Sequence, residues 1–194
     1  MRTNYLKLFI AEKILNIINW HNQFKLKNPK YKNNIKLGDS LYIEDYFSFD
    51  CNSNNFELNI GSSVHFKKYC HILLFDNARL NIGSKVFFNN YCSINCLHKI
   101  SIGENTMFGE GVKIYDHNHH NEFKDNNLIV SKFDFTTDPI IIGKNCWIGS
   151  NVTILKGVEI GDNVIIGANN LIYKSVAPNS IIKGNFSTSS FSNV

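Results

Sequence analysis

The sequence predicts an all-β fold in which short parallel strands wind into a solenoid of three-sided coils. An aliphatic or aromatic residue recurs with a period of six from residue 35 onward, and the unbroken series is Ile142, Ile148, Ile154, Ile160, Ile166 and Ile172. Earlier members fall in triplets, with phase slips only between them: Leu37/Ile43/Phe49, Ile60/Phe66/Ile72, Ile82/Phe88/Ile94 and Ile102/Phe108/Ile114. A β-sandwich gives no such fixed spacing. We expect about six coils, with loops inserted only at coil boundaries.

The other positions of the hexad predict corners and an inward face. Three residues after the aliphatic position, the best-formed coils carry Asn105, Gly111, Asn145, Asn151, Gly157, Asn163 and Asn169. Asn and Gly tolerate a left-handed backbone with little strain, which suits a corner. Val, Thr or Cys follows one residue later. Because side chains alternate along a strand, that position and the next aliphatic one both point into the coil.

The chain divides into three parts. Residues 1–34 form a basic arm, residues 35–184 form the solenoid with a long insertion at 115–139, and residues 185–194 form a tail. Apolar residues follow helical spacing in the arm, at Leu6, Phe9, Ile10, Ile14, Ile17 and Ile18. Solenoid ends need caps, so an N-terminal capping α-helix is predicted. Residues 1–36 carry eight bases and one acid, and a compatible second role is peripheral contact with an anionic membrane surface.

Composition excludes several classes of protein. Hydrophobic residues make up 43% and charged residues 19%, which argues against disorder. No apolar run approaches the roughly 18 residues that span a bilayer. Residues 1–24 do not resemble a secretory signal, because Lys7, Glu12 and Lys13 interrupt the apolar stretch. Five cysteines, an odd number, favour a reducing compartment, so a cytoplasmic location is expected. Nucleic-acid binding is not expected, because no basic groove accompanies the aromatic residues.

The repeat resembles the hexapeptide-repeat acyltransferases, over roughly residues 35–184. The segments that carry the resemblance are "NNYCSIN" (89–95), "IYDHNHH" (114–120) and "IIIGKNCWIGSNVTILKGVEIGDNVIIGANNLIYKSVAPNS" (140–180). They are most similar to galactoside and maltose acetyltransferases and to O-acetyltransferases of bacterial surface polysaccharides. The resemblance implies a left-handed parallel β-helix, a homotrimer with sites between neighbouring subunits, acetyl-CoA as the acyl donor, and no metal.

The resemblance also implies a general base and an acceptor site. A hydroxyl is a poor nucleophile at neutral pH, so a base must lie within hydrogen-bond reach, and histidine suits this role. The family's base falls at His119 here, while His117 is the alternative base and a substrate-binding candidate. Asn89 matches the family's acceptor-binding Asn. The family's acceptor-contacting acid is replaced by Cys96 and Leu97, which weighs against a simple galactoside or maltose acceptor.

Donor binding is expected around Trp147. This residue lies between two inward positions and should point outward, where a large aromatic side chain usually marks a binding surface. The resemblance places it against the pantetheine arm of coenzyme A. Further positions that match the family's coenzyme A contacts are Ser150, Ala168 and Lys174. A lysine there can pair with phosphate, whereas residues 185–194 contain no Lys or Arg.

The function expected on these grounds is transfer of an acetyl group to a sugar hydroxyl in surface polysaccharide synthesis. Three alternatives remain open. The first is an N-acetyltransferase acting on an amino sugar, and the second is a non-catalytic β-helix scaffold. The third is a metal protein like the γ-class carbonic anhydrases, which would draw on His65, His71 and the cluster at 117–120, although that family's paired-His spacing is missing.

Overall fold

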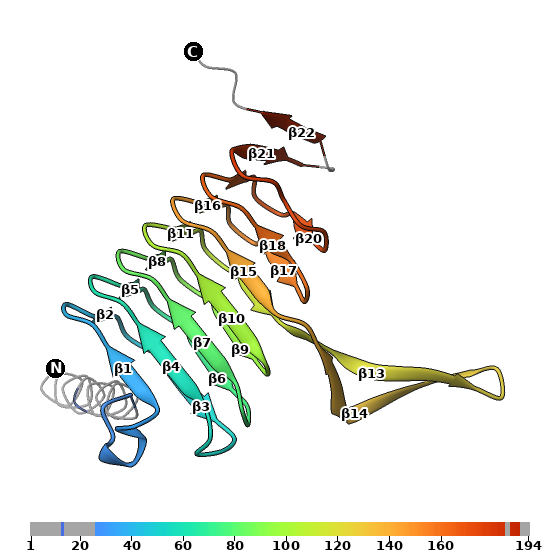
Figure 1. The fold of residues 1–194 in the computed structure, drawn as a ribbon, viewed down its shortest axis with the longest axis horizontal. Helices are drawn as coiled ribbons and strands as arrows, with labels where there is room; N and C mark the ends of the chain where they lie inside the picture. Colours follow the sequence, from blue (N-terminus) through green and yellow to red (C-terminus); the bar gives the residue numbers. More distant parts are fainter. Residues whose placement is uncertain (1–12, 14–25, 185–186, 191–194) are drawn as a thin grey trace, which may run out of the picture.

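The structure is a computed structural model that describes residues 13, 26–184 and 187–190. Its body is a prism of short parallel strands that stack into three sheets, one on each face (Figure 1). Face A holds β1 (Ile35–Leu37), β4 (Glu57–Ile60), β7 (Arg79–Ile82), β10 (Lys99–Ile102), β15 (Ile140–Ile142) and β18 (Glu159–Ile160). Face C holds β3 (Ser48–Cys51), β6 (His71–Leu74), β9 (Ser93–Cys96), β12 (Lys113–Tyr115), β17 (Thr153–Leu155) and β20 (Leu171–Ile172).

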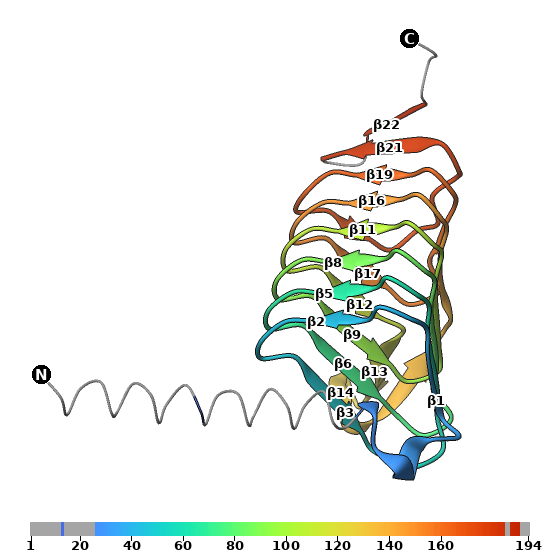
Figure 2. The same cartoon turned by 90° about the vertical axis from the view of Figure 1, so that its left-hand side faces the viewer.

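Among the described residues, face B contains eight strands, two more than face A or face C. The two additional strands lie at the C-terminal end of the prism (Figure 2). Its strands are β2 (Tyr42–Ile43), β5 (His65–Phe66), β8 (Phe87–Phe88), β11 (Met107–Phe108), β16 (Trp147–Ile148), β19 (Ile165–Ile166), β21 (Ser180–Lys183) and β22 (Ser187–Ser190). All neighbours within the three faces are parallel except β21 and β22. The predicted class, a left-handed parallel β-helix of six triangular coils, is confirmed.

The core consists of the predicted inward positions, which stack in columns along the prism axis. Phe66, Phe88 and Phe108 illustrate this, since their rings lie 4.7 Å apart and nearly parallel in successive coils. All three are at most 1% exposed. Each coil therefore buries its apolar face against its neighbours, as expected for a solenoid. The corners bring backbones so close that a Cβ on Gly103 would lie 2.5 Å from the carbonyl carbon of Gly143.

All seven predicted corner residues have a positive φ, between 56° and 76°. Between faces A and B, the corner asparagines form a ladder of side-chain amides. Asn105 donates to Asn145 at 2.9 Å, Asn145 to Asn163 at 3.2 Å, and Asn163 to Asn179 at 2.9 Å. The coils nearer the N-terminus use other residues at positive φ, including Ser63, Lys85 and three tyrosines. The hexad pattern did not predict these.

The insertion protrudes as predicted, and its backbone is a β-hairpin rather than an irregular loop. Strands β13 (His117–Lys124) and β14 (Asn127–Thr137) pair antiparallel and leave the prism between faces C and A (Figure 1). The pairing shifts from His119↔Phe135 to Asn121↔Val130, so residues 131–134 bulge out of β14. The parallel ladders continue past the insertion, because Ile100 still pairs with Ile140.

Two further expectations concern the ends of the chain. The predicted capping helix lies outside the described residues, except for Lys13. The arm contributes one short 3₁₀ helix, η1 (Pro29–Tyr31), in the described part of the chain. Within residues 13, 26–184 and 187–190, no helix has the length and hydropathy needed to cross a bilayer.

Candidate functional site

A groove of about 500 Å³ lies on the outer surface of face B, towards the C-terminal coils. It brings together three of the residues predicted to bind coenzyme A, namely Trp147, Ser150 and Ala168. The rest of its lining is mainly aliphatic and glycine, and consists of Gly149, Ile165, Ile166, Gly167, Ile181, Ile182 and Lys183. A groove with an apolar floor and few polar groups is the usual form of a small-molecule site.

Trp147 points outward as predicted, because it lies in β16 between two buried residues. Its side chain is 52% exposed, while Cys146 and Ile148 are at most 2% exposed. Met107 and Ile165 are its partners on the neighbouring strands. The indole therefore lies in an apolar row that runs along the outside of face B.

The groove includes a different lysine from the predicted one. Lys174 follows β20 on face C, and its Nζ lies 5.6 Å from the centre of the Tyr173 ring. Lys183 lines the groove instead, at its C-terminal end. The sequence contained a signal for Lys183, since it follows the buried Ile182 and must point outward. Lys174 was predicted because its position matches a coenzyme A contact of the resembled family.

His119 lies on β13 with its ring held in one tautomer. Its Nδ1 is 2.9 Å from the carbonyl oxygen of Ser131. A carbonyl oxygen only accepts hydrogen bonds, so Nδ1 carries a proton, and in the neutral ring the lone pair lies on Nε2. The ring also packs against Phe135, with a centroid distance of 4.8 Å. An exposed imidazole whose Nε2 can accept a proton is what a general base requires.

The bulge in β14 supplies the carbonyl that orients His119. The Ser131 hydroxyl donates to Asp134 Oδ2 at 2.8 Å, and its oxygen accepts the backbone N–H of Asp134 at 3.0 Å. Local bonds of this kind compete with strand pairing and hold residues 131–134 out of the ladder. Neither Ser131 nor Asp134 is among the residues predicted from the sequence to form the site. The only signal was their Ser-x-x-Asp spacing, which is typical of a side-chain-closed turn.

His117 lies beside the buried carboxylate of Asp116, which is not among the site residues predicted from the sequence. Asp116 is fully buried, and it accepts the backbone N–H groups of Leu97, His98 and Lys99, each at 2.8 Å. His117 Nδ1 lies 3.5 Å from Asp116 Oδ1. Burial acts to raise the pKa of Asp116, but His117 and the three backbone donors outweigh it, so the pKa lies below its ordinary value.

This environment separates the two histidines. The His117 side chain is only 16% exposed, and its ring is packed edge-on against Phe135 at 5.4 Å. It therefore anchors the base of the hairpin, whereas the exposed His119 is free to meet a ligand. Of the two candidate bases, the geometry favours His119.

Asn89 follows β8 at the corner between faces B and C. Its backbone N–H donates to Phe108 O at 3.0 Å, and its Oδ1 accepts the N–H of Asn90 at 2.8 Å. The first bond holds the backbone of Asn89 in the ladder, and the second holds its side-chain amide. Its Nδ2 group has no partner among the described residues, so it is available to a ligand oxygen.

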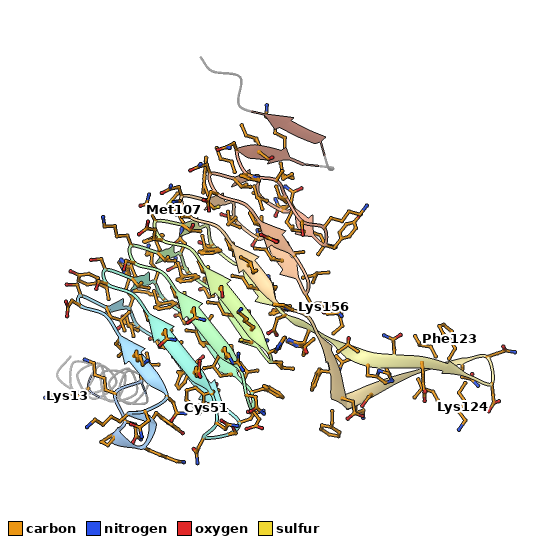
Figure 3. All side chains as sticks on the ribbon, viewed as in Figure 1. Lys13, Cys51, Met107, Phe123, Lys124 and Lys156 are labelled. Carbon is orange, nitrogen blue, oxygen red and sulfur yellow. The ribbon has the colours of Figure 1, made fainter. Side chains whose placement is uncertain are left out.

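His119 and the groove do not meet within one chain. The hairpin leaves the prism between faces C and A, whereas the groove lies on face B (Figure 1). Figure 3 shows the same separation, with Met107 on face B and Phe123 at the far end of the hairpin. The predicted site residues thus form two half-sites on different sides of the prism.

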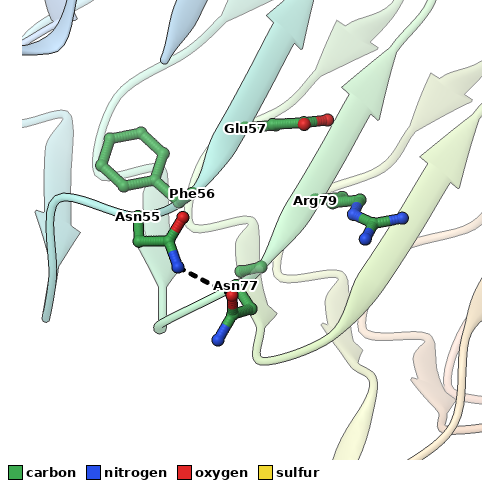
Figure 4. Close-up of a pocket in the computed structure, with 6 residues that line it drawn as sticks. Asn55, Phe56, Glu57, Asn77 and Arg79 are labelled. Atoms are coloured by element: carbon green, nitrogen blue, oxygen red, sulfur yellow. Dashed lines mark hydrogen bonds between the residues drawn. The ribbon is translucent and has the colours of Figure 1, made fainter.

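Other cavities lie at the N-terminal coils, where two of about 580 and 380 Å³ are lined by residues between 26 and 43 and hold none of the predicted site residues. A cavity of about 90 Å³ lies between faces C and A, where Asn55 Nδ2 donates to Asn77 Oδ1 at 2.7 Å beside Glu57 and Arg79 (Figure 4). That volume suits a few water molecules. In the part of the chain that the structure describes, no three His, Cys, Asp or Glu side chains are grouped as a metal site needs. His65 lies on face B and His71 on face C, so they do not converge.

Comparison with known proteins supports the resemblance. Residues 139–174 match the family described as "Bacterial transferase hexapeptide (six repeats)". The chain is 33% identical over 97 residues to "Putative lipopolysaccharide biosynthesis O-acetyl transferase WbbJ" of Escherichia coli, covering 47% of this chain and 49% of that protein. It is 37% identical over 89 residues to galactoside O-acetyltransferase of Escherichia coli, covering 45% and 41%. These matches span about half or less of each relative.

Solved structures share the fold. A mutant of AntD, an N-acyltransferase from Bacillus cereus in complex with dTDP and coenzyme A, gives a TM-score of 0.65 at 18% identity, covering 87% of each chain. The polySia-specific acetyltransferase NeuO gives a TM-score of 0.55 at 20% identity, covering 81% of this chain and 79% of that one. Identities this low establish the fold alone. The predicted resemblance to hexapeptide-repeat acetyltransferases is confirmed.

Proposed function

We propose that the protein transfers an acetyl group from acetyl-CoA to a hydroxyl group of a sugar during surface polysaccharide synthesis. The sequence relatives support this, since WbbJ and galactoside O-acetyltransferase both carry O-acetyl transfer in their names. The observation that carries the mechanism is the bond between His119 Nδ1 and Ser131 O, because it leaves Nε2 as a proton acceptor.

In this mechanism His119 moves one proton twice. Nε2 takes the proton of the sugar hydroxyl as its oxygen attacks the thioester carbonyl. The tetrahedral intermediate then collapses, the C–S bond breaks, and the imidazolium returns the proton to the leaving thiolate. Backbone N–H groups are suited to stabilise the transient oxyanion. The Ser131 carbonyl stabilises the imidazolium through the Nδ1–H bond.

The groove on face B is the proposed donor site. Its aliphatic floor and the exposed face of Trp147 suit the pantetheine arm, and Ser150 and Ala168 lie beside them. Lys183 stands at one end, where its ammonium group can pair with phosphate. Within one chain, Lys174 lies on a different side of the prism from the groove. We therefore propose that it contacts the phosphate of coenzyme A only when several copies of the chain assemble.

Assembly as a homotrimer would join the two half-sites. One row of side chains on the outside of face B is apolar or aromatic in nearly every coil, and consists of Tyr42, His65, Phe87, Met107, Trp147, Ile165 and Ile181. The hairpin also exposes apolar side chains, including Phe123 at 78% and Phe133 at 87%. Extended exposed apolar surfaces mark interaction sites. We propose that the hairpin of one copy carries His119 to the groove of the next.

Acetylation of sugars tests the proposal directly. The purified protein is incubated with acetyl-CoA and a panel of saccharides, and products are examined by mass spectrometry before and after mild alkali. An ester is removed by alkali, whereas an amide survives. We expect an alkali-labile acetyl group. An alkali-stable product would show N-acetyl transfer instead of O-acetyl transfer. The proposal is refuted if no saccharide is acetylated.

A further inference from the structure

Three tyrosines form a continuous stack at the corner between faces B and C. Tyr46, Tyr69 and Tyr91 occupy the same position in the first three coils. Their ring centroids are 4.6 and 4.8 Å apart, with an interplanar angle of 3° in each pair. Tyr69 is 43% exposed and Tyr91 is 54% exposed. The protein thus presents a ladder of aromatic rings on its surface, which we call the tyrosine ladder.

The backbone under this ladder is strained. Each tyrosine has φ = 62°, in the left-handed region that bulky side chains rarely adopt. The fold does not demand tyrosine at this corner. The same column continues with Gly111, Asn151 and Asn169, which adopt such a φ with little strain. Residues in strained backbone conformations cluster at functional sites, so this corner is a candidate binding surface.

The ladder ends beside the proposed acceptor site. Tyr91 is two residues after Asn89, and both belong to the same corner. The next position in the column is Gly111, which places no side chain above the Tyr91 ring. Polar groups flank the rings, since Asn90 precedes Tyr91, and Lys68 pairs with Asp45 at 3.7 Å one residue before the other two tyrosines.

We propose that the tyrosine ladder binds a glycan of several sugar units and extends the acceptor site along the prism. A pyranose ring has an apolar face of C–H groups and a rim of hydroxyls. It is therefore matched by an aromatic ring flanked by amide and charged side chains. A single sugar needs only the surroundings of Asn89. Three rings in successive coils offer contacts to further units of a longer chain.

This inference rests on the proposed function, because Asn89 is assigned there to the acceptor. It is tested by binding of maltohexaose, chitohexaose and a sialic acid hexamer, each compared with its monosaccharide, by isothermal titration calorimetry. We expect at least one hexamer to bind the full-length protein ten times more tightly than its monosaccharide. Tyr91→Asn places a relaxed residue at the same φ, so it should fold and lose at least tenfold in affinity for that hexamer. Its affinity for coenzyme A should not change.

The experiment is controlled by two variants and by a measurement of the molecular mass of Tyr91→Asn in solution. Tyr91→Phe keeps the stacked ring and should keep the hexamer affinity. Tyr173→Asn removes an exposed tyrosine outside the ladder and should also leave it unchanged. The proposal is overturned if no hexamer binds more tightly than its monosaccharide, or if Tyr91→Asn retains the preference. It is also overturned if Tyr91→Asn dissociates the protein without weakening glycan binding, since another copy would then cover the ladder.

The outcome separates this inference from the proposed function. If the protein acetylates a monosaccharide as efficiently as its hexamer, the proposed function stands and the glycan-binding surface is refuted. If the protein acetylates no saccharide, both the proposed function and the glycan-binding surface are refuted.

Discussion

His119 Nδ1 and the carbonyl oxygen of Ser131 lie 2.9 Å apart, across a bulge that interrupts the pairing of β13 with β14. This bond links a backbone irregularity to an acid–base property, because it decides which nitrogen of the imidazole carries the proton. The hairpin therefore orients the imidazole that we propose as the general base.

Replacing His119 with alanine should remove most of the activity. We expect kcat to fall by about 10²- to 10⁴-fold, the range typical of a lost general base. Binding of coenzyme A, measured by calorimetry, should be unchanged, because the groove on face B contains no part of His119. His120→Ala, one residue along the exposed hairpin, is the matched control. A His119→Ala enzyme that keeps wild-type turnover would falsify the mechanism.

Loosening the bulge should impair His119 without removing it. Ser131→Ala loses the hydrogen bond to the Asp134 carboxylate and the acceptor for the Asp134 N–H, and each bond should contribute about 0.5–1.5 kcal/mol. We expect kcat to fall by about two- to tenfold, with an unchanged KM for acetyl-CoA. Ser131→Thr keeps the hydroxyl and should restore kcat. Equal kcat values for the alanine and threonine variants would contradict a positioning role.

Trp147→Ala should weaken the donor site. The side chain supplies a large part of the apolar groove, so coenzyme A affinity should fall by about ten- to a hundredfold. Leu171→Ala removes an apolar side chain of similar exposure, 46% against 52%, from face C and serves as the control. If the two variants bind coenzyme A equally well, Trp147 does not belong to the donor site.

Asp116 should make stability depend on acidity. Its pKa is lower in the folded protein than in the unfolded chain, where it is about 3.9. Its ionisation therefore stabilises the fold above that value, and the contribution is lost as pH falls through the lower, folded-state pKa. We expect Asp116→Asn to lower the free energy of unfolding by about 1–3 kcal/mol at neutral pH, because an amide places N–H groups against backbone donors.

Denaturant titrations from about pH 2 to about pH 7, which extends roughly two units below and three units above the unfolded-state pKa, check this expectation. The difference between wild type and Asp116→Asn should shrink towards the acid end. A constant difference would show that the Asp116 carboxylate contributes no charge-dependent stability.

The coil architecture could be predicted because one period governs strands, corners and core together. The aliphatic series from Ile142 to Ile172 and the corner asparagines are repeated many times, so chance has little influence on the pattern. The prediction of His119 as the base rests on family positions, and the outward direction of Trp147 was predicted from alternation along the strand. The structure places Trp147 outward as expected.

Features that depend on a single contact were not accessible in this way. Asp116 is an acid beside a histidine in the sequence, and only the three-dimensional arrangement brings the N–H groups of residues 97–99 to its carboxylate. The tyrosine ladder breaks the corner rule, because Tyr46, Tyr69 and Tyr91 stand where Asn or Gly is favoured. The outward direction of Lys183 follows from alternation along its strand, but only the position of β21 beside β19 places it in the groove.

The uninterrupted pairing of β10 with β15 has an evolutionary consequence. Ile100, Ser101 and Ile102 align with Ile140, Ile141 and Ile142 as regularly as if no residues stood between the two coils. The hairpin can consequently lengthen, shorten or be exchanged for another without disturbing the scaffold that supports it. Evolution can thus change which molecules the hairpin contacts while the stacked coils beneath it stay constant.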